Sequence, residues 1–304
     1  MTLKELFPIW AEEKKKQVKI SSYSSYVMLY HRYLLPKFGE CEDIKEEEVQ
    51  QWVYELLDRE VLAKKSIGDV LICLKMILKF GMKKGLWDYK GFDILFPTSS
   101  NRSNKMEVLS KPNYKKLSDY LMENFTFKNI GLLVAMHTGM RIGEICALTW
   151  SDIDVINGVI SVDKTIQRVY IIEEDGHKHT VLNLDSTKTK ASEREIPISK
   201  KLLTKFKALK KVVNEDFYVL TNESKPTEPR TYRNYYKEVM RRLDIPPMKF
   251  HGLRHTFATY CIEGGADVKT TSVLLGHSNV SITLNTYCHP DMNKKRSVID
   301  KIFK

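Results

Sequence analysis

The chain has 304 residues, of which 42% are hydrophobic and 29% are charged. This composition is typical of a globular protein with a sizeable core, and the length suggests two domains. The formal net charge of +11 favours an acidic partner, and nucleic acid fits better than a membrane surface. No run of about 18 apolar residues occurs and the charged start is unlike a signal peptide, so we expect a cytoplasmic protein without a membrane span.

The sequence also argues against a cofactor. The cysteines are odd in number, scattered and without a C-x-x-C pair, which predicts free thiols in a reducing compartment rather than disulfides or a zinc site. No phosphate-binding G-x-x-x-x-G-K-[ST] loop is present, and no cluster of carboxylates suggests a two-metal site. We therefore predict no metal and no nucleotide cofactor.

Residues 1–97 predict a compact helical domain. Apolar residues recur at helical spacing from Leu3 onward, a third helix is expected from the acidic run 46–48, and a fourth at about 64–84. Four helices of this length predict a small bundle. Residues 98–106 then lose all periodicity and are polar and basic, which predicts an interdomain linker rather than a long loop within one domain.

The second helix of this domain has candidate signals at both ends. Ser21 and Ser22 are good N-cap residues and are expected to start it. Pro36 and Gly39 are expected to stop it, because proline lacks the N–H that a helix needs and glycine is common beyond a helix end.

Residues 107–304 predict a second domain of helices and strands. Helices are expected at about 111–124 and 131–137, followed by a turn at Gly139 and a new helix from Arg141. Helices return after the strands, from Lys200 to the end. Strand character occurs in four segments, which predict a small antiparallel sheet of about three strands, with 186–192 joining the last two: 159–162, 167–172, 180–184 and 194–198. The predicted fold is therefore mainly α, with a four-helix N-terminal domain and an α+β second domain.

A set of polar and charged residues in the second domain could carry chemistry. His251 and Arg254 are three residues apart, so on a helix they share a face, and Glu144 follows Arg141 at the same spacing. Taken singly, each member has an ordinary structural explanation: an ion pair with Glu144, a solvated lysine, packed histidines or a buried tyrosine. Their joint occurrence favours one shared site. The set is Arg141, Lys188, His251, Arg254, His277 and Tyr287.

This pattern resembles the tyrosine recombinases, the phage-integrase family of site-specific DNA recombinases. The family motif is T-G-x-R-x-x-E, a lysine in a β-hairpin, H-x-x-R, and L-G-H with a tyrosine ten residues after its histidine. The matching strings are T-G-M-R-I-G-E at 138–144, H-G-L-R at 251–254, L-G-H at 275–277, and Tyr287. Lys188 in S-T-K-T is identified as the hairpin lysine, with Lys190 and Lys164 as rivals. The first domain resembles the family's core-binding domain through weaker motifs.

The resemblance implies roles for the arginines and for His277. Arg141 and Arg254 would hold the scissile phosphate and stabilise the negative charge that builds on it, because guanidinium groups offer planar paired donors to phosphate oxygens. His277 would add a further hydrogen bond. Glu144 would support the site by orienting the basic groups.

It also implies how protons move. Tyr287 would attack the phosphate, His251 would act as the general base, and Lys188 would protonate the departing 5′-oxygen. The product is a 3′-phosphotyrosyl link with a free 5′-hydroxyl. Because the bond energy stays in that link, neither ATP nor a metal is required.

The expected function is site-specific recombination of double-stranded DNA, most simply integration and excision of a mobile element. The two domains would form a clamp on DNA, a homotetramer would assemble there, and an accessory DNA-bending or directionality protein is a candidate partner. Three alternatives stay open: a chromosome- or plasmid-dimer resolvase, a type IB topoisomerase-like relaxing enzyme, and a DNA-binding regulator without catalysis.

Overall fold

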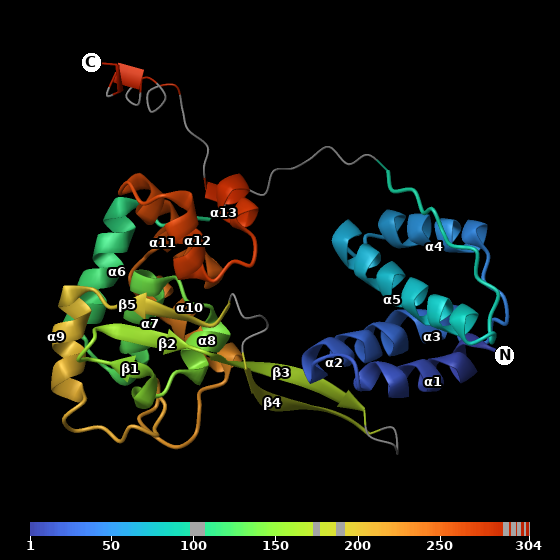
Figure 1. Cartoon of the computed structure of the whole chain (residues 1–304), viewed down its shortest axis with the longest axis horizontal. Helices are drawn as coiled ribbons and strands as arrows, with labels where there is room; N and C mark the ends of the chain where they lie inside the picture. Colours follow the sequence, from blue (N-terminus) through green and yellow to red (C-terminus); the bar gives the residue numbers. More distant parts are fainter. Residues whose placement is uncertain are drawn as a thin grey trace. The chain divides into compact units, whose positions relative to one another are not determined.

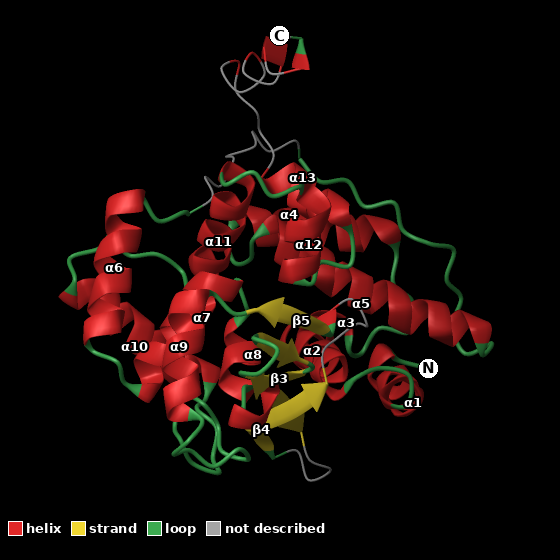
Figure 2. Cartoon of the chain, turned by 60° about the vertical axis from the view of Figure 1, so that its left-hand side comes forward, coloured by secondary structure: helices red, strands yellow, loops and turns green. Residues whose placement is uncertain are grey.

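The computed structural model describes residues 1–97, 107–172, 177–186 and 192–287, together with 292, 296, 299, 300, 302 and 303. The chain divides into two compact units (Figure 1). A helical unit comprises Met1–Ser103 and Arg168–Val181, and a mixed unit comprises Asn104–Gln167 and Leu182–Lys304. The mainly α fold is confirmed (Figure 2). No helix within the described ranges is long and apolar enough to cross a membrane. The predicted linker 98–106 lies outside the described residues.

The helical unit contains the four predicted helical segments. The first, α1, begins at a capping box in which the Thr2 hydroxyl accepts from the Glu5 N–H and the Glu5 carboxylate accepts from the Thr2 N–H. Three acidic residues open α4, where they complement the helix dipole. The elements are α1 (Leu3–Lys15), α2 (Ile20–Leu29), a π-helical turn (Tyr30–Leu34), α3 (Leu35–Phe38), α4 (Glu46–Asp58) and α5 (Lys64–Lys83).

Of the signals predicted for the second helix, the two serines and Pro36 were wrong, whereas Gly39 does end the helical segment. α2 starts at Ile20 after the extended residue Lys19, so Ser21 and Ser22 lie inside the first turn instead of capping it. Pro36 does not stop the helix either. A wider π turn directly precedes Pro36 and lets the helix pass the proline, so that Gly39 forms the C-cap of α3.

Aromatic side chains fill much of the helical unit's core. Phe7 of α1 stacks on Tyr30 with ring centroids 3.5 Å apart, and Phe38 meets Trp52 edge to face. The outer part of the β3–β4 strand pair belongs to this unit. There the Tyr170 N–H donates to the Ser24 hydroxyl at 2.7 Å.

The mixed unit follows the predicted order of elements. Its first helices lie close to their expected positions, and a short 3₁₀ turn leads into the strands. The elements are α6 (Lys111–Glu123), α7 (Phe127–Thr138), α8 (Ile142–Ala147), a 3₁₀ turn (Trp150–Asp152), β1 (Ile153–Asp154), β2 (Val159–Val162), β3 (Lys164–Ile172), β4 (Lys178–Ser186), β5 (Arg194–Pro197), α9 (Lys200–Leu209), α10 (Pro229–Arg242), α11 (His251–Glu263), α12 (Val268–Leu275) and α13 (Val280–Tyr287).

The predicted small antiparallel sheet of about three strands is present, but two of the predicted strands pair separately in a second sheet. β1, β2 and β5 make a three-stranded antiparallel sheet in which Ile160 lies opposite Ile196, and β3 pairs with β4 separately. The burial patterns explain the division. β2 and β5 each bury every second residue against the core, whereas no residue of β4 is fully buried. Because β4 has no core-facing side, it does not continue the β1–β2–β5 sheet.

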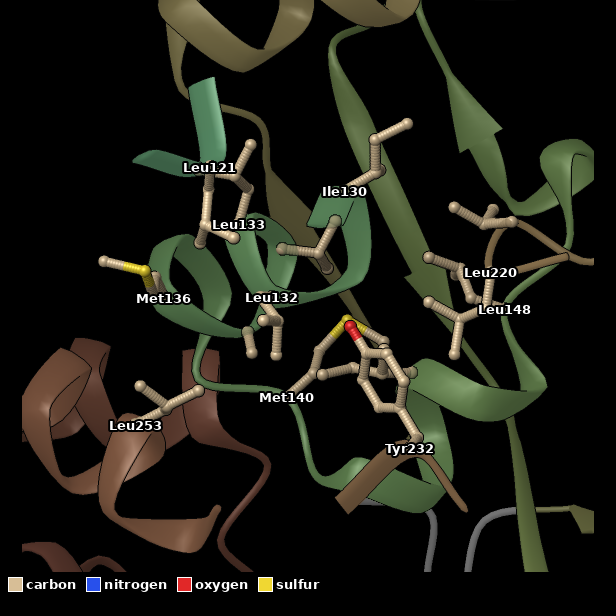
Figure 3. Packing of buried hydrophobic residues seen from close by; sticks show 14 of the residues in the cluster. Leu121, Ile130, Leu132, Leu133, Met136, Met140, Leu148, Leu220, Tyr232 and Leu253 are labelled. Atoms are coloured by element: carbon tan, nitrogen blue, oxygen red, sulfur yellow. The ribbon is translucent and has the colours of Figure 1, made fainter. Parts of the chain in front are cut away.

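Helix α7 runs through the core of the mixed unit and positions the site at its end. Figure 3 shows its side chains Leu132, Leu133 and Met136 among apolar residues that include Leu253 of α11. The helix stops at Gly139, whose φ of +63° is left-handed and turns the chain sharply into α8. The predicted turn at this glycine is therefore confirmed.

Candidate active site

Arg141 stands at the N-terminus of α8, directly after the turn. Its backbone N–H donates to Glu144 Oε2 at 2.9 Å and its Nη1 donates to Oε1 at 2.7 Å. Nη2 donates to the carbonyl of Gly276, the left-handed residue that ends α12, at 3.3 Å. The Arg141 side chain is 38% exposed, whereas that of Glu144 is 3% exposed. The carboxylate therefore anchors a guanidinium that remains open to a ligand.

Arg194 of β5 is a second partner of Glu144 that the sequence analysis missed. Its Nη2 donates to Glu144 Oε2 at 3.0 Å, and its Nε donates to the Leu274 carbonyl at 2.7 Å. Burial alone would raise the pKa of Glu144, but the ion pairs with Arg194 and Arg141 outweigh burial and lower it. Glu144 is thus an ionised carboxylate shared by two arginines.

Arg254 is the most deeply buried cation of the set, with 2% of the residue exposed. Its Nη1 donates to the Gly139 carbonyl at 2.9 Å, while Nη2 has no hydrogen-bond partner among the described residues. Burial, and then the charge of Arg141, lowers the pKa of Arg254 to about 9. A buried guanidinium with an unused donor favours an anion beside it.

His277 follows the left-handed turn at Gly276. Its Nδ1 lies 2.8 Å from the hydroxyl of Thr283 in α13. Burial and the charges of Arg254 and Arg141 lower the pKa of His277 to about 4, so the ring is neutral at pH 7. If the Thr283 hydroxyl donates to Nδ1, the ring proton lies on Nε2, which can then donate to a phosphate oxygen.

Tyr287, at the end of α13, is half-buried. Burial raises its pKa, and the charge of Arg254 partly offsets this. Its hydroxyl lies 2.7 Å from Nδ1 of His255 on α11. The sequence analysis did not select His255, although its position one turn after His251 and next to Arg254 was a usable signal.

His251 is exposed at the start of α11, and no hydrogen bond within the described residues joins it to Tyr287. Its ring lies edge to face with that of His255, with centroids 4.7 Å apart. Partial burial, and then His255, Arg254 and Arg141, lowers the pKa of His251 to about 4. It is therefore a neutral histidine at the mouth of a cationic pocket.

Of the three candidates for the hairpin lysine, the structure describes only Lys164. Lys188 and its rival Lys190 lie outside the described residues. Lys164 begins β3, and its Nζ pairs with Asp152 at 2.8 Å. It lines the same small pocket as Glu144. A Cβ on Gly143 of α8 would meet the Thr165 hydroxyl at 2.5 Å, so the start of β3 packs tightly against the helix that carries the site.

Five of the six predicted residues therefore come together from α8, α11, α13 and the α12–α13 turn. Arg141 and His251 also line a cavity of about 580 Å³ beside the site. The cavity's other basic residues are Arg233, Lys237 and Lys249, and no carboxylate is among its described lining residues. Such a concave, positively charged surface suits a polyanion. Within the described ranges, no group of three His, Cys, Asp or Glu residues could hold a metal ion.

Comparison with known families gives two matches. Residues 106–294 match the Phage integrase family, and residues 2–57 match the family described as Phage integrase, N-terminal SAM-like domain. The first match covers well over half of the chain. The second falls on the helical unit.

Several characterised proteins are similar along much of the chain. A XerC-like tyrosine recombinase of Caldanaerobacter subterraneus is 30% identical, and the alignment covers 99% of this chain and 83% of the relative. The ICEBs1 integrase of Bacillus subtilis is 26% identical over 79% of this chain, and the Tn916 transposase of Enterococcus faecalis is 26% identical over 65%. The chain spans 66% and 51% of the lengths of these last two proteins.

Solved structures show the same fold. The Tn1549 transposon integrase in complex with transposon right end DNA superposes with a TM-score of 0.80 at 20% identity, covering 100% of both chains. A lambda integrase dimer bound to a COC′ core site gives a TM-score of 0.65 at 17% identity, covering 96% of this chain and 79% of that one.

Proposed function

The chain belongs to the phage integrase family of tyrosine recombinases, and we propose that it cleaves and rejoins double-stranded DNA at specific sites through a 3′-phosphotyrosyl intermediate. One observation carries the proposal. The positive charge of Arg254 acts on the Tyr287 hydroxyl. Arg254 has an unused N–H donor and a neighbouring arginine, Arg141, and together the two guanidiniums are suited to hold a phosphate. A phenol nucleophile beside two guanidiniums matches the needs of phosphodiester cleavage.

The arginines stabilise the transition state. Attack on a phosphodiester adds negative charge to its non-bridging oxygens, and preorganised donors lower the energy of that charge without reorganising. Arg254 contributes from the buried side and Arg141 from the open side, with His277 as a neutral third donor. Loss of one such donor typically costs about 3–4 kcal/mol of transition-state stabilisation.

Tyr287 is the nucleophile, and its base comes from α11. An unperturbed phenol has a pKa of about 10, and burial raises that of Tyr287 further. Proton removal therefore needs a neutral histidine within reach. The sequence predicted His251 for this role, and α11 offers His255 as well.

The departing 5′-oxygen needs a proton from a lysine. Lys188 is the residue predicted from the sequence, with Lys190 beside it. Lys164 gains support from its position, because it lines the same small pocket as Glu144 and its Nζ pairs with Asp152 at 2.8 Å. Since the phosphotyrosyl link conserves the bond energy, the reaction runs without ATP or a metal ion.

The biological reaction we propose is integration and excision of a mobile element by a homotetramer on DNA, in the cytoplasm. The two domains close on the duplex as a clamp, and an accessory DNA-bending or directionality protein sets the outcome. The similarity to the ICEBs1 integrase and to the transposase from transposon Tn916 supports this assignment. The XerC-like relative, which aligns over nearly the whole chain, favours dimer resolution as the second candidate.

Covalent capture tests the proposal. The protein is incubated with nicked duplexes of random sequence around the nick, so that the short fragment with the free 5′-hydroxyl diffuses away after cleavage and the adduct cannot rejoin. DNA that stays attached in SDS is sequenced and rebuilt as a single test duplex. We expect an adduct with the wild-type protein and none with Tyr287→Phe. A wild-type protein that binds the library but forms no adduct would contradict the enzymatic assignment.

The same test duplex separates the candidate reactions. Two copies on one plasmid should support inversion or deletion, depending on their orientation, and copies on two plasmids should support joining if the protein is an integrase. A resolvase would recombine only sites on one molecule. A topoisomerase-like enzyme would relax a plasmid that carries a single site.

A further inference from the structure

The nucleophile already has a hydrogen-bond partner outside the predicted residue set. His255 Nδ1 and Tyr287 Oη are 2.7 Å apart, and the two rings lie at 52° with centroids 5.7 Å apart. Both residues are partly buried. His255 sits on α11 directly after Arg254, so the helix that holds the phosphate-binding arginine also holds the partner of the tyrosine.

The groups around His255 favour its neutral form. Arg254 and His251 face it from α11, Tyr287 from α13, and Glu107 acts on it from the segment before α6. Burial and then Arg254 lower the pKa of His255, against a smaller opposing effect of Glu107. A neutral ring with an unprotonated Nδ1 accepts the hydrogen bond, and the phenol is the donor.

We propose that His255 accepts the Tyr287 proton during strand cleavage and returns it during rejoining. This inference rests on the proposed function. As the Oη–phosphorus bond forms, the phenolic proton moves to Nδ1, and the bond from phosphorus to the 5′-oxygen breaks with a proton supplied by the acidic lysine. Rejoining reverses each step: the 5′-hydroxyl returns its proton to the lysine, and His255 returns its proton to Tyr287.

The assignment also gives His251 a different task. His251 is exposed and lines the cationic cavity with Arg141, whereas no hydrogen bond among the described residues links it to the phenol. A neutral histidine in that position can donate to a phosphate oxygen. Its edge-to-face contact with His255 helps to fix the orientation of the ring that takes the proton.

Replacement of His255 by asparagine separates proton transfer from hydrogen bonding. The asparagine amide oxygen reaches about the position of Nδ1 and can accept the phenol's hydrogen bond, but it cannot take the proton. His137→Asn is a matched control, because Nδ1 of His137 also lies 2.8 Å from a hydroxyl, that of Ser199, away from the site. Cleavage of the nicked test duplex is measured in single-turnover experiments, alongside gel-shift affinity and melting temperature.

We expect His255→Asn to lower the cleavage rate at pH 7 by about a hundredfold or more, the usual contribution of a general base, with DNA affinity unchanged. The wild-type rate should rise with pH to a plateau, governed by a group with a pKa below 6.5. In His255→Asn the plateau should disappear and the rate should follow hydroxide. His137→Asn and His251→Asn should keep the wild-type shape, although His251→Asn is slower.

Any of three results would overturn the assignment, and the first two concern His255→Asn. One is a His255→Asn rate within about threefold of wild type, well below the effect expected for a general base. The other is a slowing by the same factor at every pH, which indicates that His255 only positions the tyrosine. Loss of the plateau in His251→Asn instead would return the role of base to His251. Failure of the wild-type protein to form any adduct would overturn the proposed function itself, and this inference with it.

Discussion

At the scale of single residues, Glu144 holds two arginines of the candidate site, Arg141 and Arg194. Its carboxylate binds Arg141 on one side and Arg194 on the other, and both Glu144 and Arg194 are 3% exposed. A buried charge of this kind is tolerated only while its partners remain, because the desolvation cost is offset by the ion pairs. The site is therefore coupled to the stability of the mixed unit.

Glu144→Gln should destabilise the mixed unit by about 3–5 kcal/mol, the usual cost of removing one partner from a buried ion pair. Two guanidiniums would lose their countercharge at once. Urea denaturation measures the change. Glu238→Gln is the control, because Glu238 forms an exposed pair with Arg241 on α10 and should change stability by less than about 1 kcal/mol. Equal stability of the two variants would contradict the account.

The ion pairs of Glu144 also predict that the stability of the mixed unit depends on pH. The pKa of Glu144 is lower in the folded protein than its ordinary value of 4.5, so the stabilisation is fully present above pH 4.5. It is lost as the pH falls through the folded-state value. Urea denaturation at a series of acidic pH values should show this loss in the wild type and not in Glu144→Gln. Parallel pH curves for the two proteins would indicate that Glu144 does not contribute.

At the scale of elements, the corner between α7 and α8 brings the arginines together. Gly139 ends α7 in a left-handed conformation, offers its carbonyl to Arg254, and lies two residues before Arg141. A Cβ at this position would meet Phe257 at 2.6 Å and Leu275 at 2.9 Å. The backbone conformation and the close packing therefore both require glycine.

Gly139→Ala should lower the stability of the mixed unit by about 1–3 kcal/mol, because a side chain is strained in this conformation, and should slow cleavage as well. Gly68→Ala in α5 is the control: nothing lies within 4 Å of its Cβ position, and alanine favours a helix, so stability should stay level or rise by up to about 1 kcal/mol. Melting temperatures and cleavage rates check both. Wild-type stability in Gly139→Ala would contradict the account.

Three lysines are candidates for the acid that protonates the leaving group: Lys164 at the start of β3, and Lys188 and Lys190. Alanine variants of Lys164, Lys188 and Lys190 can be compared on the test duplex and on a duplex with sulfur in place of the 5′-bridging oxygen. A thiol has a pKa of about 8.5 and leaves without an acid. The true acid should lose about 10²–10⁴-fold activity on the oxygen substrate and little on the sulfur substrate. If no lysine shows this difference, the acid is another group.

The elements show where local patterns suffice and where they fail. Periodicity found α4, α5, β2 and β5 nearly to the residue. It failed at Pro36, because the helix continues past this proline after a π turn at Tyr30–Leu34. It also failed for the sheets, because strand pairing depends on which strands have a core face to bury.

The candidate site was also predicted only in part, because some of its contacts join residues that are distant in sequence. Arg141, His251, Arg254, His277 and Tyr287 lie in short strings that could be recognised directly. Arg194 and His255 contact partners that are distant in sequence, Glu144 and Tyr287. The alternation in β5 nevertheless places Arg194 on the same buried face as Ile196, and a buried arginine implies a buried carboxylate.

At the scale of the whole molecule, charge should dominate binding. The chain carries a net charge of +11, and a clamp on DNA would form most of its contacts to phosphates. Affinity should fall with salt with a log–log slope of about −0.9 per phosphate contact. Gel shifts of the uncleavable Tyr287→Phe protein across a salt series measure that slope. Binding that is insensitive to salt would contradict a phosphate-based clamp.

The central claim is that Tyr287 becomes covalently linked to DNA, and mapping that link is its most direct test. The adduct trapped on the nicked duplex is digested with nuclease and protease, and the peptides are analysed by mass spectrometry. We predict one modified peptide, with a 3′-linked nucleotide phosphate on Tyr287. A phosphate linked to any other residue, or an adduct that persists in Tyr287→Phe, would contradict the account.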